Sequence, residues 1–164
     1  MIVVSDTTPL ISLMKVSRLD ILSVLFQEVS IPEAVFCELT ANPRFQAEAD
    51  QIRRAPFIKV VKVSEQKAVN ILRRSSGLDL GESEAIVFAD DQKADVLLMD
   101  EAKGRKVAKA MGLYIMGTVG VLLFAFEQNV LTNTEVREAL EQLRQTDRRI
   151  GDELIQYALR KLSN

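Results

Sequence analysis

Short apolar runs alternate along the chain with longer segments in which apolar residues recur every three or four positions. Most of the short runs are continuous and rich in β-branched residues, which is typical of strands buried in a parallel sheet. The third run alternates instead and carries Lys59 and Lys62, which favours the edge of the sheet. The sequence predicts strands at residues 2–5, 29–32, 57–63, 96–99 and 113–116.

The longer segments predict helices, and proline or glycine marks several of their ends. Pro9 stands where the first helix could begin, with Thr8 as its cap, and Pro32 starts the next one. Gly77 and Gly112 each end a later helix. We expect one or two short helices over residues 10–22, and further helices over about residues 32–41, 47–54, 64–76, 81–91, 101–112, 117–129, 134–144 and 150–162.

Strands that alternate with helices indicate parallel βαβ units with right-handed crossovers. The predicted fold class is therefore α/β, a three-layer α/β/α sandwich with a central parallel sheet and extra C-terminal helices. The chain of 164 residues suits one well-buried domain, and no linker or repeat interrupts it. We expect a single domain over residues 1–164, with a core at 1–131 and a C-terminal helical appendage at 132–164.

The predicted appendage carries two apolar stripes at helical spacing: Val136, Leu140 and Leu143, then Ile150, Leu154, Ala158 and Leu162. Thr132 or Thr134 is expected to cap the first of these helices. Amphipathic stripes must bury against something. They either cover the core of the same domain or form a surface for a second copy or another protein.

Composition removes several classes of chemistry. The chain has no histidine and one cysteine, Cys37, which excludes Ser-His-Asp and Cys-His catalysis, intrachain disulfides and His- or Cys-based zinc sites. The formal net charge is −2, so contact with nucleic acid requires a local basic patch. The first residues do not read as a signal peptide, and the longest apolar stretch is too short for a bilayer. We expect a cytoplasmic protein with no membrane partner.

Acidic residues lie close to the ends of the predicted strands. Asp6 and Asp100 each close an apolar run, and Glu82 lies in the first turn of the helix before the second of these runs. Glu38 shares a helix face with Val35, which predicts an inward carboxylate that needs Lys, Arg or a metal as partner. Ligands of open α/β sheets bind at the carboxyl ends of strands.

Carboxylates that converge at one sheet edge repel one another unless a cation neutralises them. Oxygen-only ligands suit Mg²⁺ or Mn²⁺, so the pattern indicates a metal-dependent enzyme that cleaves phosphodiesters. We expect Asp6 and Asp100 to be direct ligands, and Glu38 and Glu82 to bind a second ion or to orient its water.

Each acid also has an ordinary structural explanation. Asp6 and Asp100 suit helix caps, Glu38 suits an exposed helix face, and Glu82 with Glu84 suits the positive end of a helix dipole. The joint pattern favours the site, although each residue alone does not decide the matter.

Basic residues follow Asp100 directly. Lys103, Arg105 and Lys109, with Lys106 beside them, could bind substrate phosphates, although a solvated helix face is the more ordinary explanation. The pair Arg148 and Arg149 has the same two explanations. Aromatic residues make up only 5% of the chain, so recognition of bases by stacking is expected to be weak.

Five segments in order, VVSDTTPLI, PEAVFCEL, LGESEAIVFA, LLMDEAKGRKVAKAMGL and GTVGVLL, resemble PIN-domain proteins. The likeness is strongest to a prokaryotic branch with a Gly-Glu-x-Glu-Ala-Ile segment and an Asp-(Asp/Glu)-x-x-Gly-Arg segment. The resemblance implies a PIN-like fold and a metal-dependent ribonuclease, often the toxin of a toxin–antitoxin pair. It implies that the catalytic, metal-binding acids are Asp6, Glu38, Glu82 and Asp100.

The resemblance also assigns supporting roles and partners. Thr7 or Thr8 and Thr118 match hydroxyl positions that support the site; for Thr118, a hydrogen bond to Asp6 or to a metal-bound water is expected, and a helix cap is the alternative. The implied partners are single-stranded RNA, a small antitoxin protein and a second copy of the chain in a homodimer.

The sequence departs from the common PIN pattern in three ways. The third acid is Glu82 with Glu84 close behind, the fourth is Asp100 or Glu101, and the helices after residue 133 are additional. These departures leave an alternative function, a degenerate PIN-like module that binds a protein or RNA without cleavage. A haloacid-dehalogenase motif would need an Asp where Thr8 stands, and a receiver domain would need an N-terminal acidic pair.

Overall fold

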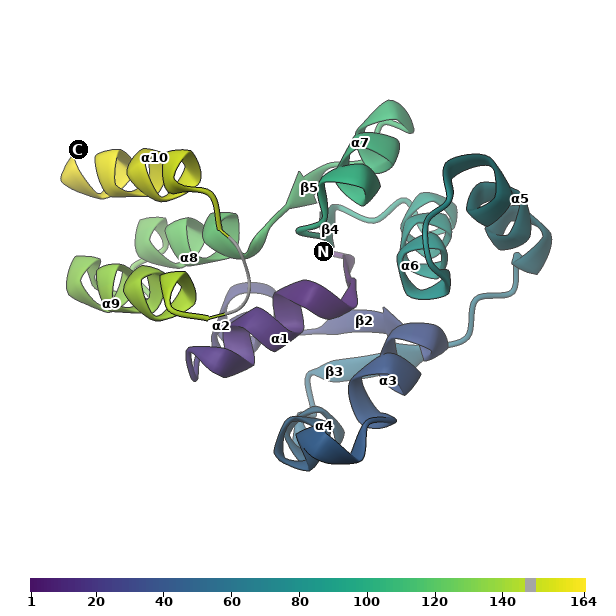
Figure 1. Ribbon diagram of the computed structural model, residues 1–164, viewed down its shortest axis with the longest axis horizontal. Helices are drawn as coiled ribbons and strands as arrows, with labels where there is room; N and C mark the ends of the chain where they lie inside the picture. The colour runs from purple at the N-terminus through teal and green to yellow at the C-terminus, as the bar shows by residue number, and fades with distance from the viewer. Residues whose placement is uncertain (147–149) are drawn as a thin grey trace.

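A five-stranded parallel sheet lies at the centre of the computed structural model, which describes residues 1–146 and 150–164 (Figure 1). The order across the sheet is β3-β2-β1-β4-β5, and every neighbouring pair is parallel. The strands are β1 (Val3–Ser5), β2 (Val29–Pro32), β3 (Ile58–Val61), β4 (Val96–Leu98) and β5 (Ile115–Met116). All five predicted strands and their parallel arrangement are confirmed.

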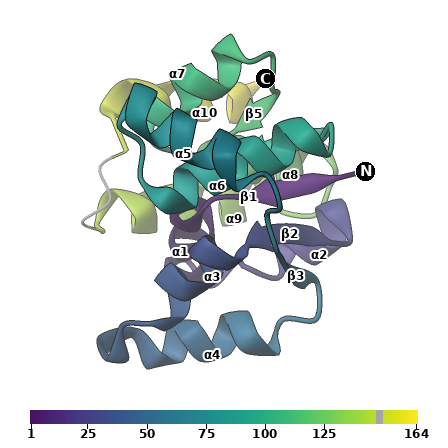
Figure 2. The same ribbon diagram turned by 90° about the vertical axis from the view of Figure 1, so that its right-hand side faces the viewer.

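Helices flank the sheet on both faces, as Figures 1 and 2 show from two directions. In chain order they are α1 (Thr7–Lys15), α2 (Ile21–Phe26), α3 (Glu33–Thr40), the short 3₁₀ helix η1 (Pro43–Phe45), α4 (Gln46–Arg54), α5 (Gln66–Ser76), α6 (Leu80–Asp91), α7 (Ala102–Ala110), α8 (Thr118–Glu127), α9 (Asn133–Arg144) and α10 (Asp152–Ser163). None of the helices in the described residues is both long and apolar enough to cross a membrane.

Alternate residues of the central strands face two different apolar layers. Val4 of β1 and Leu97 of β4 pack in the cluster that includes residues of α6 and α7. Val3 and Leu98 pack on the other face, in the larger cluster to which α1, α2 and α8 contribute. This alternation follows from the two-residue period of a strand, and it produces the predicted three-layer α/β/α sandwich. At the edge strand β3, Lys59 and Val60 are exposed, as predicted for that run.

The C-terminal helices pack on this larger cluster. Buried residues of α9 and α10, such as Leu140 and Leu162, belong to the same apolar cluster as Leu10 of α1 and Leu122 of α8. The α9 stripe is therefore buried within the chain itself, which is the first of the two alternatives for these helices. Thr132 caps α9 in a capping box with Glu135, so the first of the two expected caps is the one observed.

Several helix boundaries differ from the sequence-based prediction. The first helix begins at Thr7, not at Pro9, and Asp6 takes the N-cap position that was assigned to Thr8. The segment 10–22 forms two helices, because the chain turns at Ser17 with a φ of 56°. Helix α6 begins at Leu80, because the side chain of Asp79 caps its first turn.

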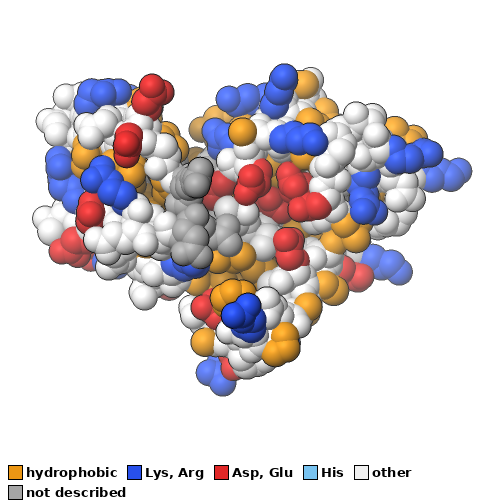
Figure 3. Space-filling model, in the orientation of Figure 1, with side chains coloured by type: hydrophobic (Ala, Val, Ile, Leu, Met, Phe, Trp, Pro, Cys, Tyr) orange, Lys and Arg blue, Asp and Glu red, His pale blue; other side chains and the backbone are white. Residues whose placement is uncertain are grey.

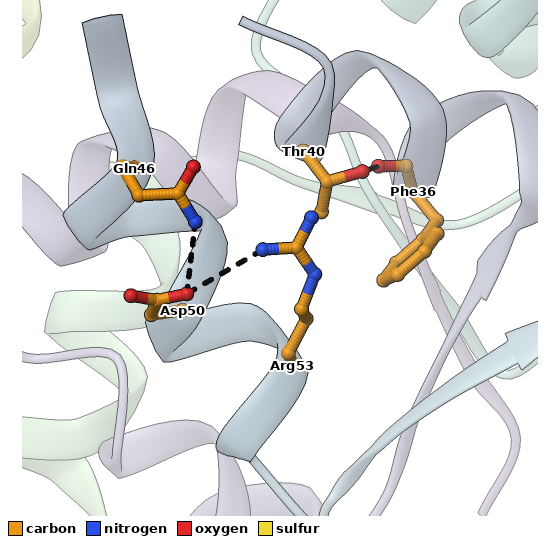
Figure 4. Close-up of polar contacts among 5 residues, drawn as sticks. All are labelled: Phe36, Thr40, Gln46, Asp50 and Arg53. Carbon is orange, nitrogen blue, oxygen red and sulfur yellow. Dashed lines mark hydrogen bonds and ion pairs between the residues drawn. The ribbon is translucent and has the colours of Figure 1, made fainter. Parts of the chain in front are cut away.

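Contacts along α3 and α4 are local (Figure 4). The hydroxyl of Thr40 donates to the carbonyl of Phe36 at 2.8 Å. Gln46 and Arg53 both donate to Asp50, at 3.0 and 3.4 Å. The charge of Arg53 is therefore balanced within its own helix.

Candidate functional site

Asp6 and Asp100 lie at the same edge of the sheet. Their strands are parallel neighbours, with Ser5 opposite Leu98, and the amide of Asp6 donates to the carbonyl of Leu98 at 2.9 Å. Each acid follows its strand closely, so both lie at the carboxyl end, where open α/β sheets bind ligands. The sequence-based placement of these two acids at a common edge is thus confirmed.

Asp6 is a buried carboxyl among other carboxyls. Only 2% of the residue is exposed, and burial raises its pKa from 3.8 to about 7. The charges of Asp79, Glu38 and Glu101 raise the pKa further, while a hydrogen bond from the backbone of Thr7 lowers it. In the part of the chain that the structure describes, no side-chain bond caps helix α1, so Asp6 occupies the N-cap position without performing the usual capping role.

Glu82 and Asp79 form the second part of the acidic cluster. Asp79 Oδ1 accepts a hydrogen bond from the amide of Glu82 at 2.8 Å. The pKa of Glu82 is raised to about 7, first by burial, then by the side-chain hydrogen bond with Asp79 and by the charges of Asp79 and Asp6. Asp79 was not among the site residues predicted from the sequence. An Asp three residues before a Glu, at the start of a helix, was the signal that could have found it.

Glu38 reaches the cluster from α3, but its side chain is exposed. It lies at the margin of the buried face that Val35 and Leu39 form, so the predicted inward orientation is wrong. Among the described residues its partner is Thr7, whose hydroxyl donates to Glu38 Oε2 at 2.6 Å. A β-carbon placed on Gly81 would lie 3.1 Å from that same oxygen, so Glu38 reaches the start of α6.

Thr118 holds Asp100 with two hydrogen bonds. Its amide donates to Oδ1 at 2.7 Å and its hydroxyl donates to Oδ2 at 2.6 Å. The expected contact of Thr118 with Asp6 is therefore replaced by a contact with Asp100, and Gly117 takes the N-cap position of α8. Arg105 Nη1 donates to the carbonyl of Met99 at 2.9 Å, which places a guanidinium beside the same carboxylate.

The other acidic and hydroxyl residues predicted for the site lie in two different parts of the structure. Glu84 is buried on another side of α6, where its carboxylate accepts a bond from Gln66 Nε2 at 3.4 Å. The structure therefore brings Glu82, and not Glu84, to Asp6. Glu101 is exposed at the N-cap of α7, and Thr8 lies with it in the cavity described next.

A cavity of about 720 Å³ opens beside the acidic cluster. Its polar lining includes Glu38, Asp100, Glu101, Thr8 and Thr118. Figure 3 shows the acidic side chains gathered as a red patch near the middle of this face of the molecule. The site is therefore accessible to a ligand from outside.

Glycine permits close approach at two points of the site. A β-carbon on Gly104 would lie 2.6 Å from Met99 Sδ and 3.0 Å from Glu82 Oε2. A β-carbon on Gly117 would lie 2.8 Å from Asp100 Oδ1. A side chain at Gly117 would press on Asp100, and one at Gly104 would press on Met99 and, less closely, on Glu82, so both glycines contribute to the shape of the site.

The chemistry of the donor set fits a divalent cation, although the side chains are not gathered around one point. Within residues 1–146 and 150–164, no three acidic side chains are close enough together to hold a metal ion. The expectation that four acids lie within metal-bridging reach is thus not met in this arrangement. Threonine hydroxyls hold Glu38 and Asp100, and rotation of these exposed or half-buried side chains would be required. The donors are all oxygens, and the raised pKa values of Asp6 and Glu82 reflect burial and negative charge that a cation would offset.

The basic residues predicted to bind phosphate differ in exposure and in their contacts. Lys103 and Lys109 are exposed on α7, whereas the guanidinium of Arg105 is held by the main chain beside Asp100. Arg148 and Arg149 lie outside the described residues.

A family model described as a PIN domain, DUF3368, matches residues 2–164. With the parallel sheet and the strand-end acids, this match shows that the chain belongs to the PIN-domain family, and the matched range includes the C-terminal helices. The search of curated proteins gave no match, and the search of solved structures gave none either.

Proposed function

We propose that the protein is a metal-dependent ribonuclease that hydrolyses phosphodiester bonds of single-stranded RNA. The observation that carries this proposal is the acidic cluster at the carboxyl end of the sheet, in which Asp6 is buried beside the half-buried Glu82 and the exposed Asp79. Burying mutually repelling carboxylates costs stability, and stability costs of this kind concentrate at functional sites. Membership of a family that often contains nucleases supports the same proposal.

The residues of the chain have distinct tasks in this proposal. Asp6 and Asp100, from neighbouring strand ends, would hold Mg²⁺ or Mn²⁺ together with Glu82 and Glu38. The ion supplies charge neutralisation at the phosphate and an activated water when it is bound. Thr118 fixes the orientation of Asp100 through its two hydrogen bonds.

Asp79 fixes the start of α6 through its bond to the amide of Glu82. In this way it sets the position of Glu82 relative to Asp6. Thr7 has a similar task for Glu38, since its hydroxyl holds one carboxylate oxygen. Removal of either group should therefore act on activity through the carboxylate that it positions.

A second candidate function is a PIN-like module that binds RNA or a protein without cleavage. One observation favours it: within the described residues no three acids are poised to hold an ion, and threonine hydroxyls hold two of the expected ligands. Binding of Mn²⁺ separates the two candidates, because a non-cleaving module does not need it.

The experiment is cleavage of an end-labelled single-stranded RNA by the full-length protein with Mg²⁺, with Mn²⁺ and with excess EDTA. We expect cleavage only with metal, and none by Asp6→Asn, which keeps the size of the side chain but loses its charge. Equal cleavage by the variant, or by the wild type in EDTA, would contradict the mechanism. Binding of RNA without cleavage under any condition would favour the second candidate.

The biological partners form a finer part of the proposal. We propose that the protein acts as the toxin of a toxin–antitoxin pair, as a homodimer that a small antitoxin protein binds. The support is the resemblance of its motifs to proteins with that role. Induced expression in a bacterial host should arrest growth, and Asp6→Asn should not; arrest by both proteins would contradict a toxin that acts by cleavage.

A further inference from the structure

A basic hollow lies at the end of α5, next to the acidic cluster. It has a volume of about 590 Å³ and is lined by Asn70, Arg73, Arg74, Gly77 and Leu78. A cation from another helix reaches it, because a β-carbon on Gly77 would lie 2.8 Å from Lys103 Nζ. Three cations from two helices therefore meet at one hollow, and its lining among the described residues contains no acid.

No carboxylate of the described residues forms an ion pair with these cations. Elsewhere, Arg18, Arg53 and Arg144 each pair with a carboxylate at 3.4 to 3.6 Å. In the part of the chain that the structure describes, no ion pair involves Arg73, Arg74 or Lys103. The three charges are thus available to an external anion.

Helix stability does not account for the arrangement. Arg73 and Arg74 lie in the last turn of α5, where cations suit the helix dipole. Lys103 lies in the first turn of α7, where the dipole disfavours a cation, and the nearest acid along the chain is Glu101 at the N-cap. Lys103 thus opposes its own helix dipole and extends to Gly77 at the end of α5, which indicates a ligand shared with the arginines of that helix.

Two short stretches of the chain connect the hollow with the acidic cluster. Gly104, next to Lys103, closely approaches Glu82, and Gly77 is two residues from Asp79. Figure 3 shows Lys and Arg side chains over α7 and over α5, bordering the red acidic patch. A polyanion that enters the acidic site therefore passes these cations as it leaves.

We propose that Arg73, Arg74 and Lys103, with the amide of Asn70, bind the phosphate backbone of the RNA strand next to the cleaved bond. This inference rests on the proposed function and extends it to α5, which the sequence analysis did not assign to the substrate. Among the described residues no aromatic side chain lines the hollow, so it offers no stacking platform and binds phosphates without regard to sequence. The substrate is then a strand that extends beyond the two nucleotides of the cleaved bond.

The test is binding of a fluorescent single-stranded RNA at several salt concentrations, with Asp6→Asn present in every protein to prevent cleavage. The patch variant is Arg73→Ala with Arg74→Ala. The control is Arg53→Ala with Arg54→Ala, which removes the same charge from an exposed arginine pair in the last turn of another helix, α4. We expect the patch variant to lose affinity on the order of tenfold and to lower the slope of log K against log salt by about 1.4, since each single-strand phosphate contact contributes about 0.7. The control should keep both values.

The outcomes separate this inference from the proposed function. If RNA binds the patch variant and the control with equal affinity and slope, the assignment of α5 is wrong, and cleavage by the Asp6-containing protein still decides the function. If no protein binds RNA, the assignment of α5 is wrong, and cleavage by the Asp6-containing protein again decides the function. If RNA binding depends on Arg73 and Arg74 but the Asp6-containing protein does not cleave RNA with metal, the assignment of α5 is correct. In that case the proposed ribonuclease activity is wrong. For an active enzyme, the patch variant should lose cleavage of long RNA and keep cleavage of a dinucleotide; equal loss on both substrates would overturn the inference.

Discussion

Thr118 and Asp100 share two hydrogen bonds, so a residue at the start of α8 fixes a carboxylate at the end of β4. Thr118 is 2% exposed, and its hydroxyl has no other partner in the described residues. The pair therefore joins two elements that are neighbours through β5 and sets the direction of one candidate ligand.

Replacement of Thr118 by valine should weaken the site more than the fold. The shape is retained, but one oxygen of Asp100 loses its donor, which costs about 1–2 kcal/mol of unfolding free energy. Activity should fall roughly tenfold or more, because groups that orient metal ligands have effects of that size. Urea denaturation and kcat/KM measure the two effects. Thr118→Ser, which retains the hydroxyl, should recover most of the activity; unchanged activity in the Thr118→Val protein would show that this bond does not orient the site.

Asp6 makes the metal-free protein less stable as the pH rises. Its pKa is raised from 3.8 to about 7 in the fold, so the folded state binds the proton more tightly than the unfolded chain. The stability that comes from protonated Asp6 is fully present below about pH 4 and is lost as the pH rises through 7. The loss amounts to about 4 kcal/mol of unfolding free energy for this buried group. Asp6→Asn should therefore unfold at higher denaturant than the wild type at pH 8 in EDTA, and at a similar concentration at pH 4. A variant that is less stable at pH 8 would contradict this account.

A bound cation should offset the loss of unfolding free energy that ionised Asp6 causes. In the wild type, Mn²⁺ at roughly a hundredfold excess over its Kd should add about 2.7 kcal/mol to the unfolding free energy. Asp6→Asn should respond weakly, because it lacks a charged ligand. Glu84→Gln is the matched control, since Glu84 lies on the same helix as Glu82 but contacts Gln66. A thermal shift series decides the point, and an equal Mn²⁺ response in all three proteins would place the ion elsewhere.

Gly104→Ala tests whether the close approach of Gly104 in α7 to Glu82 is needed for activity. Alanine favours the helix by about 1 kcal/mol, but its methyl group would press on Met99 and Glu82, so the net change in stability should be small. Displacement of Glu82 should lower activity on the order of a hundredfold. Gly151→Ala, where a β-carbon meets nothing within 4 Å, is the control for an added methyl group. Full activity in Gly104→Ala would remove Glu82 from the catalytic proposal.

The sequence predicted the elements well because their signals are local. The short runs that became β1 and β4 bury all of their residues, and Gly77 ends α5 with a φ of 75°. The site was predicted less completely, because the hydrogen-bond partner of each side chain depends on how the helices pack against the sheet. Thr118 pairs with Asp100, and Glu38 turns to Thr7 at the margin of its buried face. No periodicity encodes such choices, since they follow from how α3 and α8 meet their neighbouring strands.

Asp79 shows a second limit of the sequence. An Asp before a helix is usually a cap, and Asp79 does cap α6. The same carboxylate also raises the pKa values of both Asp6 and Glu82. One residue thus has a structural and an electrostatic role, and only the structure shows the second.

The exposed side of α10 provides the test of self-association. Leu154 and Tyr157 are 46% and 45% exposed, whereas the opposite face of the helix is buried in the core. In the proposed homodimer this exposed face forms part of the interface, so light scattering at tens of micromolar should give twice the mass of the chain. Leu154→Lys should yield a monomer with unchanged secondary structure, because the side chain contributes little to the core. Leu140→Ala, in the buried stripe of α9, should lower the unfolding free energy by about 2–5 kcal/mol and leave the protein dimeric when folded. A monomeric wild type would reject the dimer, and a dimeric Leu154→Lys protein would move the interface away from α10.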